Sequence, residues 1–146
     1  MKGLEYSISH LCEAESLGIL QRFDTMFTPC LSTRVDIKSY SIKLSKYASW
    51  ILCKHCSSVV GYIAYYHNIE SSTNYITSIC VLDTFRNYKI ATHMLEYIIK
   101  EDSSSISTIK LECRKNNMSA LQFYKKNGFA IAEDTGDNYI MVKLLK

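Results

Sequence analysis

Linker and membrane-spanning segments are scarce in this sequence. It has one proline and five glycines among 146 residues, so no stretch rich in either residue divides it. Its apolar runs are far shorter than the roughly 20 residues that cross a bilayer as a helix. We therefore expect a single domain over residues 1–146, large enough to bury a substantial core, with no membrane partner.

A strong charge of one sign is also missing. Lys and Arg number 17 against 14 Asp and Glu, which gives a net charge of +3. Domains that bind nucleic acid usually gather many more basic residues on one face, so we expect no nucleic-acid partner. A mildly positive chain remains suited to a small anionic ligand.

Cysteine is present, but not in the pattern of a disulfide framework or a complete metal site. The six cysteines stand at positions 12, 30, 53, 56, 80 and 113. No basic stretch and apolar segment of a secretory signal follow Met1, which favours a cytoplasmic protein with free thiols. Cys53-Lys-His-Cys56 has the spacing of half a zinc site, but no second ligand pair stands at a matching spacing. We interpret the cysteines as packing or surface residues and predict no metal.

The hydrophobic periodicity predicts an α/β (α+β) chain. Strand patterns cover residues 4–9, 49–53, 59–66, 75–82, 108–113, 130–133 and 139–145, and helical spacing covers 11–23, 37–47, 90–100 and 117–126. Ser9, Asp36 and Asn117 are candidate N-terminal caps of three of the helices. The strand–helix–strand order over 75–113 predicts a parallel pair, and the short connections elsewhere predict antiparallel pairs. The expected fold is one mixed, mostly antiparallel sheet of about seven strands with helices on both faces, in the order β-α-α-β-β-β-α-β-α-β-β.

The turn between the strand 75–82 and the helix 90–100 carries Arg86 and Lys89. The first N–H groups of a helix lack partners and carry partial positive charge, so a helix that starts after a strand forms a binding place for an anion. The turn therefore predicts a site for phosphate or pyrophosphate. The alternative is a solvated loop that happens to be basic.

Two stretches resemble motifs of the GCN5-related N-acetyltransferase (GNAT) family. RNYKIA at 86–91 resembles the family's acyl-CoA loop, which has Arg or Gln, two residues, Gly, one residue, then Gly or Ala. NMSALQFYKKNGF at 117–129 matches the next family motif in its Asn, Ala, Tyr and Gly-Phe. Both motifs stand in the family's order and on the expected elements. The resemblance implies an acyl-CoA-dependent N-acetyltransferase that uses acetyl-CoA as co-substrate.

The resemblance also implies which residues bind coenzyme A. In the family, the strand equivalent to 75–82 parts from its neighbour, pairs with the pantetheine arm and polarises the thioester carbonyl. The loop and helix amides hold the pyrophosphate. The cofactor-binding residues implied in this sequence are Ile79, Cys80, Val81, Arg86, Asn87, Tyr88, Lys89, Ile90, Ala91, Thr92 and Asn117.

One residue departs from the family pattern, because Lys89 stands where the loop has its central Gly. Gly allows the backbone a close approach to phosphate. Lys must hold φ below zero or accept strain. Its charge then either contributes to binding, or the loop binds the cofactor weakly. We favour retained binding, because the neighbouring motif residues are intact.

The motif register implies that Tyr124 is the general acid that protonates the departing thiolate. The alternative is a core tyrosine, since the chain has 11. Cys80 and Cys113 lie on the strands implied to part, but no His is placed to activate either, so direct attack by the amine is favoured over an acyl-enzyme. The general base cannot be read from the sequence; the candidates by residue type are Glu70, Asp83, Glu112, His67 and His93.

The acceptor is less defined. Aromatic residues are mixed with Ser and Thr over 27–47, and Tyr62, Tyr65 and Tyr66 follow. They suit a small primary amine with a ring face, such as an amino sugar or a nucleotide-linked amino sugar, whose phosphates would meet Arg34 or Lys38. An amino acid, a polyamine and a protein amine rank lower, and no acidic cluster suits a polyamine.

Three other classes stay open: a non-catalytic acyl-CoA-binding or sensing module of the same fold, a protein that binds another phosphate, and a structural protein. Neither glycine-rich nucleotide-binding pattern occurs, which argues against the second. The weakly alternating strand Tyr139–Leu145 is a candidate sheet edge at which a homodimer could form.

Overall fold

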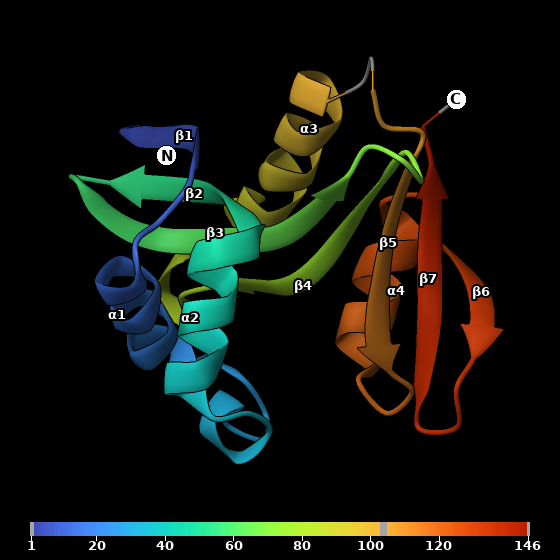
Figure 1. Cartoon of the computed structure of the whole chain (residues 1–146), viewed down its shortest axis with the longest axis horizontal. Helices are drawn as coiled ribbons and strands as arrows, with labels where there is room; N and C mark the ends of the chain where they lie inside the picture. The colour runs from blue at the N-terminus through green and yellow to red at the C-terminus, as the bar shows by residue number, and fades with distance from the viewer. Residues whose placement is uncertain (1, 103–104, 146) are drawn as a thin grey trace.

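The computed structural model describes residues 2–102 and 105–145. Its helices and strands follow the predicted order, with three added short 3-10 helices (Figure 1). The strands are β1 (Leu4–Ser9), β2 (Ala48–His55), β3 (Ser58–Asn68), β4 (Thr73–Val81), β5 (Thr108–Arg114), β6 (Ala130–Asp134) and β7 (Asn138–Leu144). The helices are α1 (Glu13–Phe23), η1 (Asp24–Met26), η2 (Leu31–Thr33), α2 (Ile37–Tyr47), η3 (Asp83–Phe85), α3 (Ile90–Asp102) and α4 (Met118–Lys126).

All seven strands form one sheet in the order β1-β2-β3-β4-β5-β7-β6. Every pair is antiparallel except β4 with β5, which is parallel and is connected through α3. The predicted fold class is therefore confirmed. The outer strands of the sheet are β1 and β6, so the expectation that Tyr139–Leu145 forms an edge is wrong: β7 lies between β5 and β6.

The sheet has two parts that are joined at one end only. The pairing of β4 with β5 begins at Thr73 with Thr108 and ends at Ile76 with Leu111. Beyond this point the strands diverge, and β5, β7, β6 and α4 form a separate group in orange and red (Figure 1). We call the space between Thr77–Val81 and Glu112–Arg114 the β4–β5 gap.

The divergence coincides with a bulge in β4. In the register of β3 with β4, Ala64 opposes Ser78 and Tyr65 opposes Ile76, which leaves Thr77 without an opposite residue. Tyr40 of α2 fixes this residue, since its hydroxyl lies 2.6 Å from Thr77 Oγ1 and 3.3 Å from the Thr77 carbonyl oxygen. A bulge bends its strand and raises the local twist, so it turns the end of β4 away from β5.

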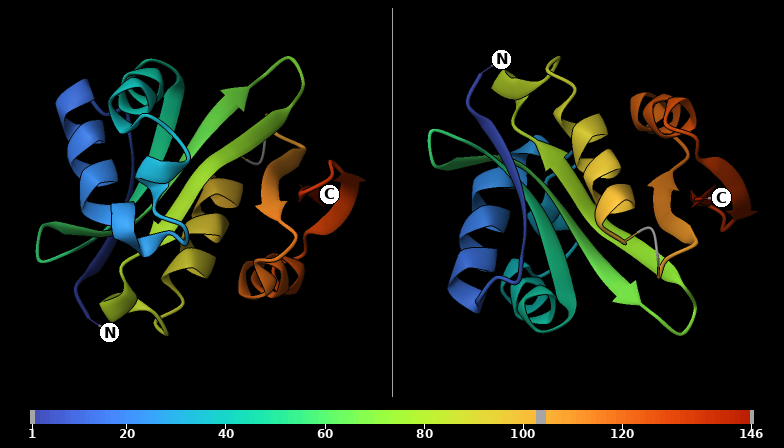
Figure 2. Two further views of the ribbon diagram at one scale, coloured as in Figure 1. Left: turned by 90° about the horizontal axis from the view of Figure 1, so that it is seen from below. Right: turned by 90° about the horizontal axis from the view of Figure 1, so that it is seen from above.

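Two hydrophobic cores lie on the two faces of the sheet. The first packs α3 and α4 against one face and contains Ile63, Ile76, Met94 and Tyr124. The second packs α1 and α2 against the other face and is built around Trp50 and Tyr62. Figure 2 shows α1 and α2 on one side of β3 and β4 and α3 on the other. No helix among the described residues is long and apolar enough to cross a membrane.

The predicted start of the first helix is wrong. Ser9 belongs to β1, and α1 is capped at Cys12, whose backbone N–H donates to Glu15 Oε1 at 3.0 Å. A carboxylate three residues after the cap satisfies this amide as a capping box does, so the cap did not need a hydroxyl. That residues 1–146 form a single domain stays a prediction.

Candidate active site

The gap exposes backbone groups of β4. Leu82 donates its N–H to Val60 of β3 at 2.9 Å, and residues alternate in direction along an antiparallel strand. Cys80 and Ser78 therefore face β3, whereas the N–H and C=O of Ile79 and Val81 point into the gap, where no described residue of β5 pairs with them. Of the three strand residues implied to bind the cofactor, two thus offer free backbone hydrogen-bonding groups.

The turn after β4 has the conformation that a glycine normally supplies. After the short helix η3, Asn87 has a φ of 75° and Lys89 a φ of 58°. Both are left-handed backbone conformations, which cost most residues about 1–2 kcal/mol. The sequence left two possibilities for Lys89, a φ below zero or a strained backbone, and the structure has the strained backbone. The loop thus adopts a glycine-like conformation although Lys89 replaces the glycine.

α3 begins at Ile90, directly after Lys89, so its first N–H groups open at the end of β4. Ile90 is buried and anchors the helix start in the core, while Ala91 and Thr92 are half-buried and the side chains of Arg86 to Lys89 are exposed. Phe85 packs between His55 and Tyr88, with ring centroids 5.3 and 6.5 Å away. Residues 86–92, which were predicted to bind the cofactor, therefore lie at the end of β4 beside the β4–β5 gap.

Tyr124 lies on α4 at the base of the gap. Its side chain is 8% exposed, and its ring contacts Phe123 and Phe129 at centroid distances of 5.4 and 5.6 Å. Burial, and then the thiols of Cys113 and Cys80, raise its pKa well above the ordinary value. Since these thiols belong to β5 and β4, the phenol lies close to both walls of the gap. No described residue hydrogen-bonds its oxygen.

Asn117 is the N-cap of α4, as predicted. Its Oδ1 accepts from the backbone N–H of Ala120 at 3.2 Å and from the hydroxyl of Ser119 at 3.3 Å. Because β4 and β5 run parallel, the turn that holds Asn117 lies at the same edge of the sheet as residues 86–92. Its side-chain NH₂ has no bond within the described residues.

Only one of the five candidate bases lies on the wall of the gap. Glu112 follows Leu111, the last residue of β5 that pairs with β4, and its Oε2 accepts from Asn138 Nδ2 at 3.0 Å. His67 interacts with Asn74 Oδ1 at 2.8 Å, and His93 with the Tyr6 hydroxyl at 3.2 Å. The other two, Glu70 and Asp83, lie in the β3–β4 turn and at the start of η3.

Three tyrosines, Tyr40, Tyr66 and Tyr75, lie on the side of the β4–β5 gap that faces α2. Burial, helped by the phenols of Tyr66 and Tyr75 and opposed by the hydrogen bond with Thr77, raises the pKa of Tyr40 to about 12. Burial, and then Glu112 and Tyr66, raise the pKa of Tyr75. The mutual effects show that Tyr40, Tyr66, Tyr75 and Glu112 cluster. The sequence analysis missed Tyr75, and its position just before the parting strand end was the available signal.

The thiols of the gap are buried. Cys80 is 8% and Cys113 6% exposed, and burial raises the pKa of both, that of Cys80 to about 11. Neither is a ready nucleophile at neutral pH. Cys53 of the half-zinc pattern is fully buried, whereas Cys56 is exposed in the β2–β3 turn. In the part of the chain that the structure describes, no three Cys, His, Asp or Glu side chains gather as metal ligands.

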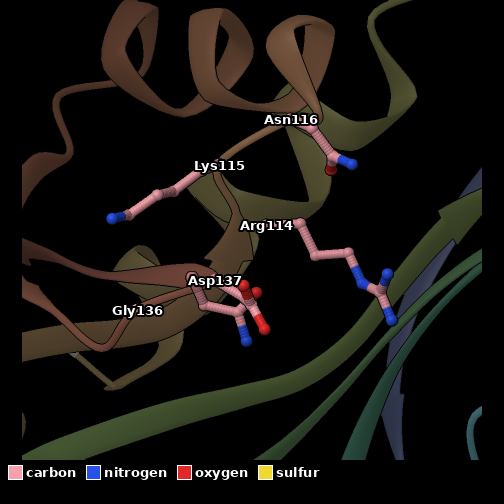
Figure 3. A pocket seen from close by; sticks show the side chains of 6 residues that line it. Arg114, Lys115, Asn116, Gly136 and Asp137 are labelled. Atoms are coloured by element: carbon pink, nitrogen blue, oxygen red, sulfur yellow. The ribbon is translucent and has the colours of Figure 1, made fainter.

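An open pocket of about 490 Å³ lies where β5 ends, beside the turn between β6 and β7. Figure 3 shows its lining: Arg114, Lys115, Asn116, Gly136, Asp137 and Asn138. Lys115 Nζ pairs with Asp134 at 2.6 Å, while the Arg114 side chain extends away from that turn. The pocket adjoins the gap on the side of Glu112.

A strand that leaves its parallel neighbour, a left-handed turn before a helix, and a buried tyrosine beneath them occupy the region where the family resemblance implied the acyl-CoA site. The model of the Acetyltransferase (GNAT) family matches residues 19–129. The chain belongs to this family, and it is an acyl-CoA-dependent N-acetyltransferase. No curated protein matches the sequence.

Solved structures share the fold at low sequence identity. The PaiA N-acetyltransferase of Thermoplasma acidophilum in complex with coenzyme A is 15% identical, with a TM-score of 0.73 over 96% of this chain and 99% of its own. A GNAT-family acetyltransferase of Staphylococcus aureus is 18% identical, with a TM-score of 0.74 over 97% and 100%. The ribosomal-protein-S18-alanine N-acetyltransferase of Escherichia coli is 17% identical, with a TM-score of 0.75 over 97% and 95%.

Proposed function

We propose that the protein transfers the acetyl group of acetyl-CoA to the primary amine of a small molecule by direct attack. The observation that carries this proposal is the β4–β5 gap with Tyr124 at its base. Ile79 and Val81 offer free backbone groups to an extended pantetheine arm, as an added strand would use them. Val81, not Cys80, has the amide that is free to polarise the thioester carbonyl.

In this proposal the turn before α3 binds the pyrophosphate. The left-handed residues Asn87 and Lys89 turn the backbone so that the first amides of α3 are accessible, and Arg86 adds charge beside them. Asn117 has a free side-chain NH₂ that can donate to the pantetheine. Binding of this kind depends on the backbone, which supports retained affinity despite Lys89.

The chemistry assigns one role to each of two side chains. The amine nitrogen forms a bond to the acetyl carbon, the carbon–sulfur bond breaks, and Tyr124 donates its proton to the departing sulfur. Glu112 accepts the proton that the amine loses, directly or through water. Tyr124 carries its proton at neutral pH, as a general acid must. Burial raises its pKa further, so the proton moves only as the departing sulfur gains negative charge beside it. The raised pKa of Cys80 argues against a covalent route through that thiol.

The acceptor side supports a ring-bearing amine such as an amino sugar. Tyr40, Tyr66 and Tyr75 supply aromatic rings on this side, and the Tyr66 hydroxyl is buried without a hydrogen-bond partner among the described residues. A hydroxyl of the acceptor would satisfy it. A protein amine, the class named for the Escherichia coli relative, is the alternative acceptor. The cytoplasmic location and a homodimer stay predictions.

The test has two stages. Acetyl-CoA is titrated into the protein by calorimetry with adenosine diphosphate as control, and we expect micromolar affinity that exceeds the control at least tenfold. Release of coenzyme A is then followed with amino sugars, amino acids, polyamines and a peptide with a free N-terminus. Turnover with an amino sugar supports the proposal. Tight binding without turnover on any amine supports the non-catalytic acyl-CoA-binding module instead, and no binding contradicts both.

A further inference from the structure

Two consecutive residues at the bulge of β4 are each bound by a tyrosine hydroxyl. The hydroxyl oxygen of Tyr40 lies 2.6 Å from Thr77 Oγ1, and that of Tyr62 lies 2.8 Å from Ser78 Oγ. Both tyrosines belong to or pack on the second core, under α1 and α2. Thr77 and Ser78 therefore point to the same face of the sheet, although neighbours in a regular strand point to opposite faces. The two hydrogen bonds hold the bulge in this form.

The two tyrosines differ in their surroundings. Tyr62 is fully buried, and its ring centroid lies 5.1 Å from that of Phe23 and 5.2 Å from that of Trp50. Tyr40 is half-buried and reaches the bulge from α2, on the acceptor side of the gap. Tyr62 is thus part of the permanent core, whereas Tyr40 connects the bulge to a helix that is separate from the strands.

Tyr40 binds both polar groups that Thr77 offers on this side. Besides the contact with Oγ1, the Tyr40 hydroxyl donates to the Thr77 carbonyl oxygen at 3.3 Å. The two bonds are compatible, because the Thr77 hydroxyl can donate to the phenolic oxygen while the phenol donates to the carbonyl. Thr77 has no opposite residue in β3, and it follows Ile76, the last residue of β4 that pairs with β5. Tyr40 therefore binds β4 at the residue where it leaves β5.

The direction of β4 at Thr77 decides where the backbone groups of the gap lie. Ile79 and Val81 stand two and four residues further along the same strand. A change of direction of about 10° at Thr77 would displace Val81 by about 2 Å, since a strand rises by roughly 3.3 Å per residue. A misplacement of about 1 Å caused by a remote substitution can lower a reaction rate about 100-fold.

We propose that Tyr40 is a positioning residue for acetyl transfer: its hydroxyl holds the bulge and so places the free backbone groups of Ile79 and Val81 against the pantetheine arm and the thioester carbonyl. The inference rests on the proposed function. Tyr40 acts through β4 and does not touch the reacting atoms. Because it belongs to α2, one hydroxyl group links the acceptor side of the site to the part that binds the cofactor.

Tyr40→Phe removes this hydroxyl and keeps the ring. Calorimetric titration should show acetyl-CoA affinity at least fivefold lower than in the wild type. The affinity for adenosine diphosphate should stay within twofold, because this ligand contacts the turn before α3 and not the gap. With the amine that gives the highest turnover, kcat should fall at least tenfold while the KM of the amine stays within threefold. A residue that bound the acceptor directly would change that KM instead.

Substitutions of Thr77 test whether Tyr40 acts through the bulge. Thr77→Val removes the partner hydroxyl and should lower acetyl-CoA affinity at least threefold. Thr77→Ser keeps a hydroxyl at the same position and should restore affinity to within twofold of the wild type. The double variant Tyr40→Phe with Thr77→Val should bind no more than twofold less tightly than Tyr40→Phe alone, because both changes break the same contact.

Tyr97→Phe is the matched control, since it removes the hydroxyl of another half-buried helix tyrosine, on α3, and should leave binding and turnover unchanged. Unchanged acetyl-CoA affinity and kcat in Tyr40→Phe would overturn the inference, and so would an equal loss of affinity for acetyl-CoA and adenosine diphosphate, or additive losses in the double variant. In each of these cases acetyl transfer itself stands. Failure of the wild type to bind acetyl-CoA would contradict the proposed function, and the inference with it.

Discussion

Lys89 takes a backbone conformation that its side chain disfavours. Its φ of 58° is typical of glycine, yet the residue directly precedes the buried Ile90 that anchors α3. The packing of Ile90 and the rest of the first core therefore holds the turn in place. Strain of this kind persists only where the surrounding structure determines it, and it is common at ligand sites.

Lys89→Gly should raise the free energy of unfolding by about 0.5–1 kcal/mol. Relief of the left-handed conformation gains about 1–2 kcal/mol, and the greater freedom of glycine in the unfolded chain offsets part of it. Acetyl-CoA affinity should stay within a few fold. Denaturant unfolding and calorimetric titration measure the two quantities.

Lys89→Ala is the control, because it removes the charge and keeps the Cβ atom. It should not share the gain in stability. If both variants lose acetyl-CoA affinity equally and by more than tenfold, the lysine charge contributes to binding and the backbone reading of the loop is wrong.

Tyr124→Phe should lower turnover at least tenfold and leave acetyl-CoA affinity nearly unchanged. The ring keeps its contacts with Phe123 and Phe129, and only the proton donor is lost. Tyr97→Phe, a half-buried tyrosine on α3 that stacks on Tyr6, is the matched control and should be neutral. Unchanged turnover in Tyr124→Phe would remove it as the general acid.

Arg86→Ala should weaken acetyl-CoA binding several fold, since it removes an exposed charge beside the amides that start α3. The loss should diminish at high salt, because exposed charges are screened. Calorimetric titration at two ionic strengths measures both effects. Affinity that does not respond to this substitution would count against the phosphate-binding role of the turn.

Sequence patterns predicted where the residues of a contiguous motif lie, while their binding and catalytic roles stay predictions. Tyr124, Asn117 and residues 86–92 lie where their motifs implied, because each motif is one local turn with its helix. Glu112 and Tyr75 were not singled out together. They come near each other only because β4 and β5, which are distant in sequence, pair up to Ile76 and Leu111, and no short-range pattern encodes that pairing.

At the scale of elements, the sequence predicted the type and order of every helix and strand of the main fold, because periodicity and turn residues are local signals. The bulge at Thr77 was not predictable. It depends on the hydroxyl of Tyr40 on α2 and on a register set by β3, both remote in sequence. The bend of β4 that opens the β4–β5 gap therefore depends on tertiary contacts and not on local sequence.

The contacts of β3 with α3 and β4 leave little room for a Cβ atom at Gly61. A Cβ atom there would lie 3.1 Å from Ile90 Cγ2 and 3.3 Å from Val81 Cγ2. Gly61→Ala should therefore lower the free energy of unfolding by about 1–3 kcal/mol. It should also weaken acetyl-CoA binding, because it displaces the start of α3. Denaturant unfolding and calorimetric titration report on these effects.

Gly18→Ala is the opposite case and the natural control. Gly18 lies in α1 with nothing within 4 Å of an added Cβ atom, and alanine is the better helix former. The substitution should raise stability by about 0.5–1 kcal/mol. If both alanine variants behaved alike, the tight packing of β3 on α3 would not be the cause.

At the scale of the whole molecule, stability should fall as pH rises from about 9 to about 12. Burial raises the pKa of Cys80 from 9.0 to about 11 and that of Tyr40 from 10.0 to about 12, and it raises those of Tyr62 and Tyr124 as well. Between the two pKa values of such a group, the folded protein holds a proton that the unfolded chain has lost.

The stabilisation is therefore complete below pH 9 and is lost as pH rises toward the folded values, by up to about 1.4 kcal/mol per pH unit for each group. Denaturant unfolding at intervals from pH 7 to 11.5 measures the slope. Tyr40→Phe should make the slope shallower above pH 10. A stability that is flat to pH 11.5 would contradict the burial of these groups.

The two parts of the sheet are joined only where β4 pairs with β5, and this junction affects the order in which the chain folds. β2, β3 and β4 form antiparallel pairs with near neighbours in sequence, as do β6 and β7, so each part contains contacts that form early. The parallel pairs from Thr73 to Ile76 must instead close a loop through all of α3. We expect this junction to form after the hairpins on either side of it. The opening for the substrate then comes into being only after these hairpins have folded, so the ability to bind acetyl-CoA marks a late folding step.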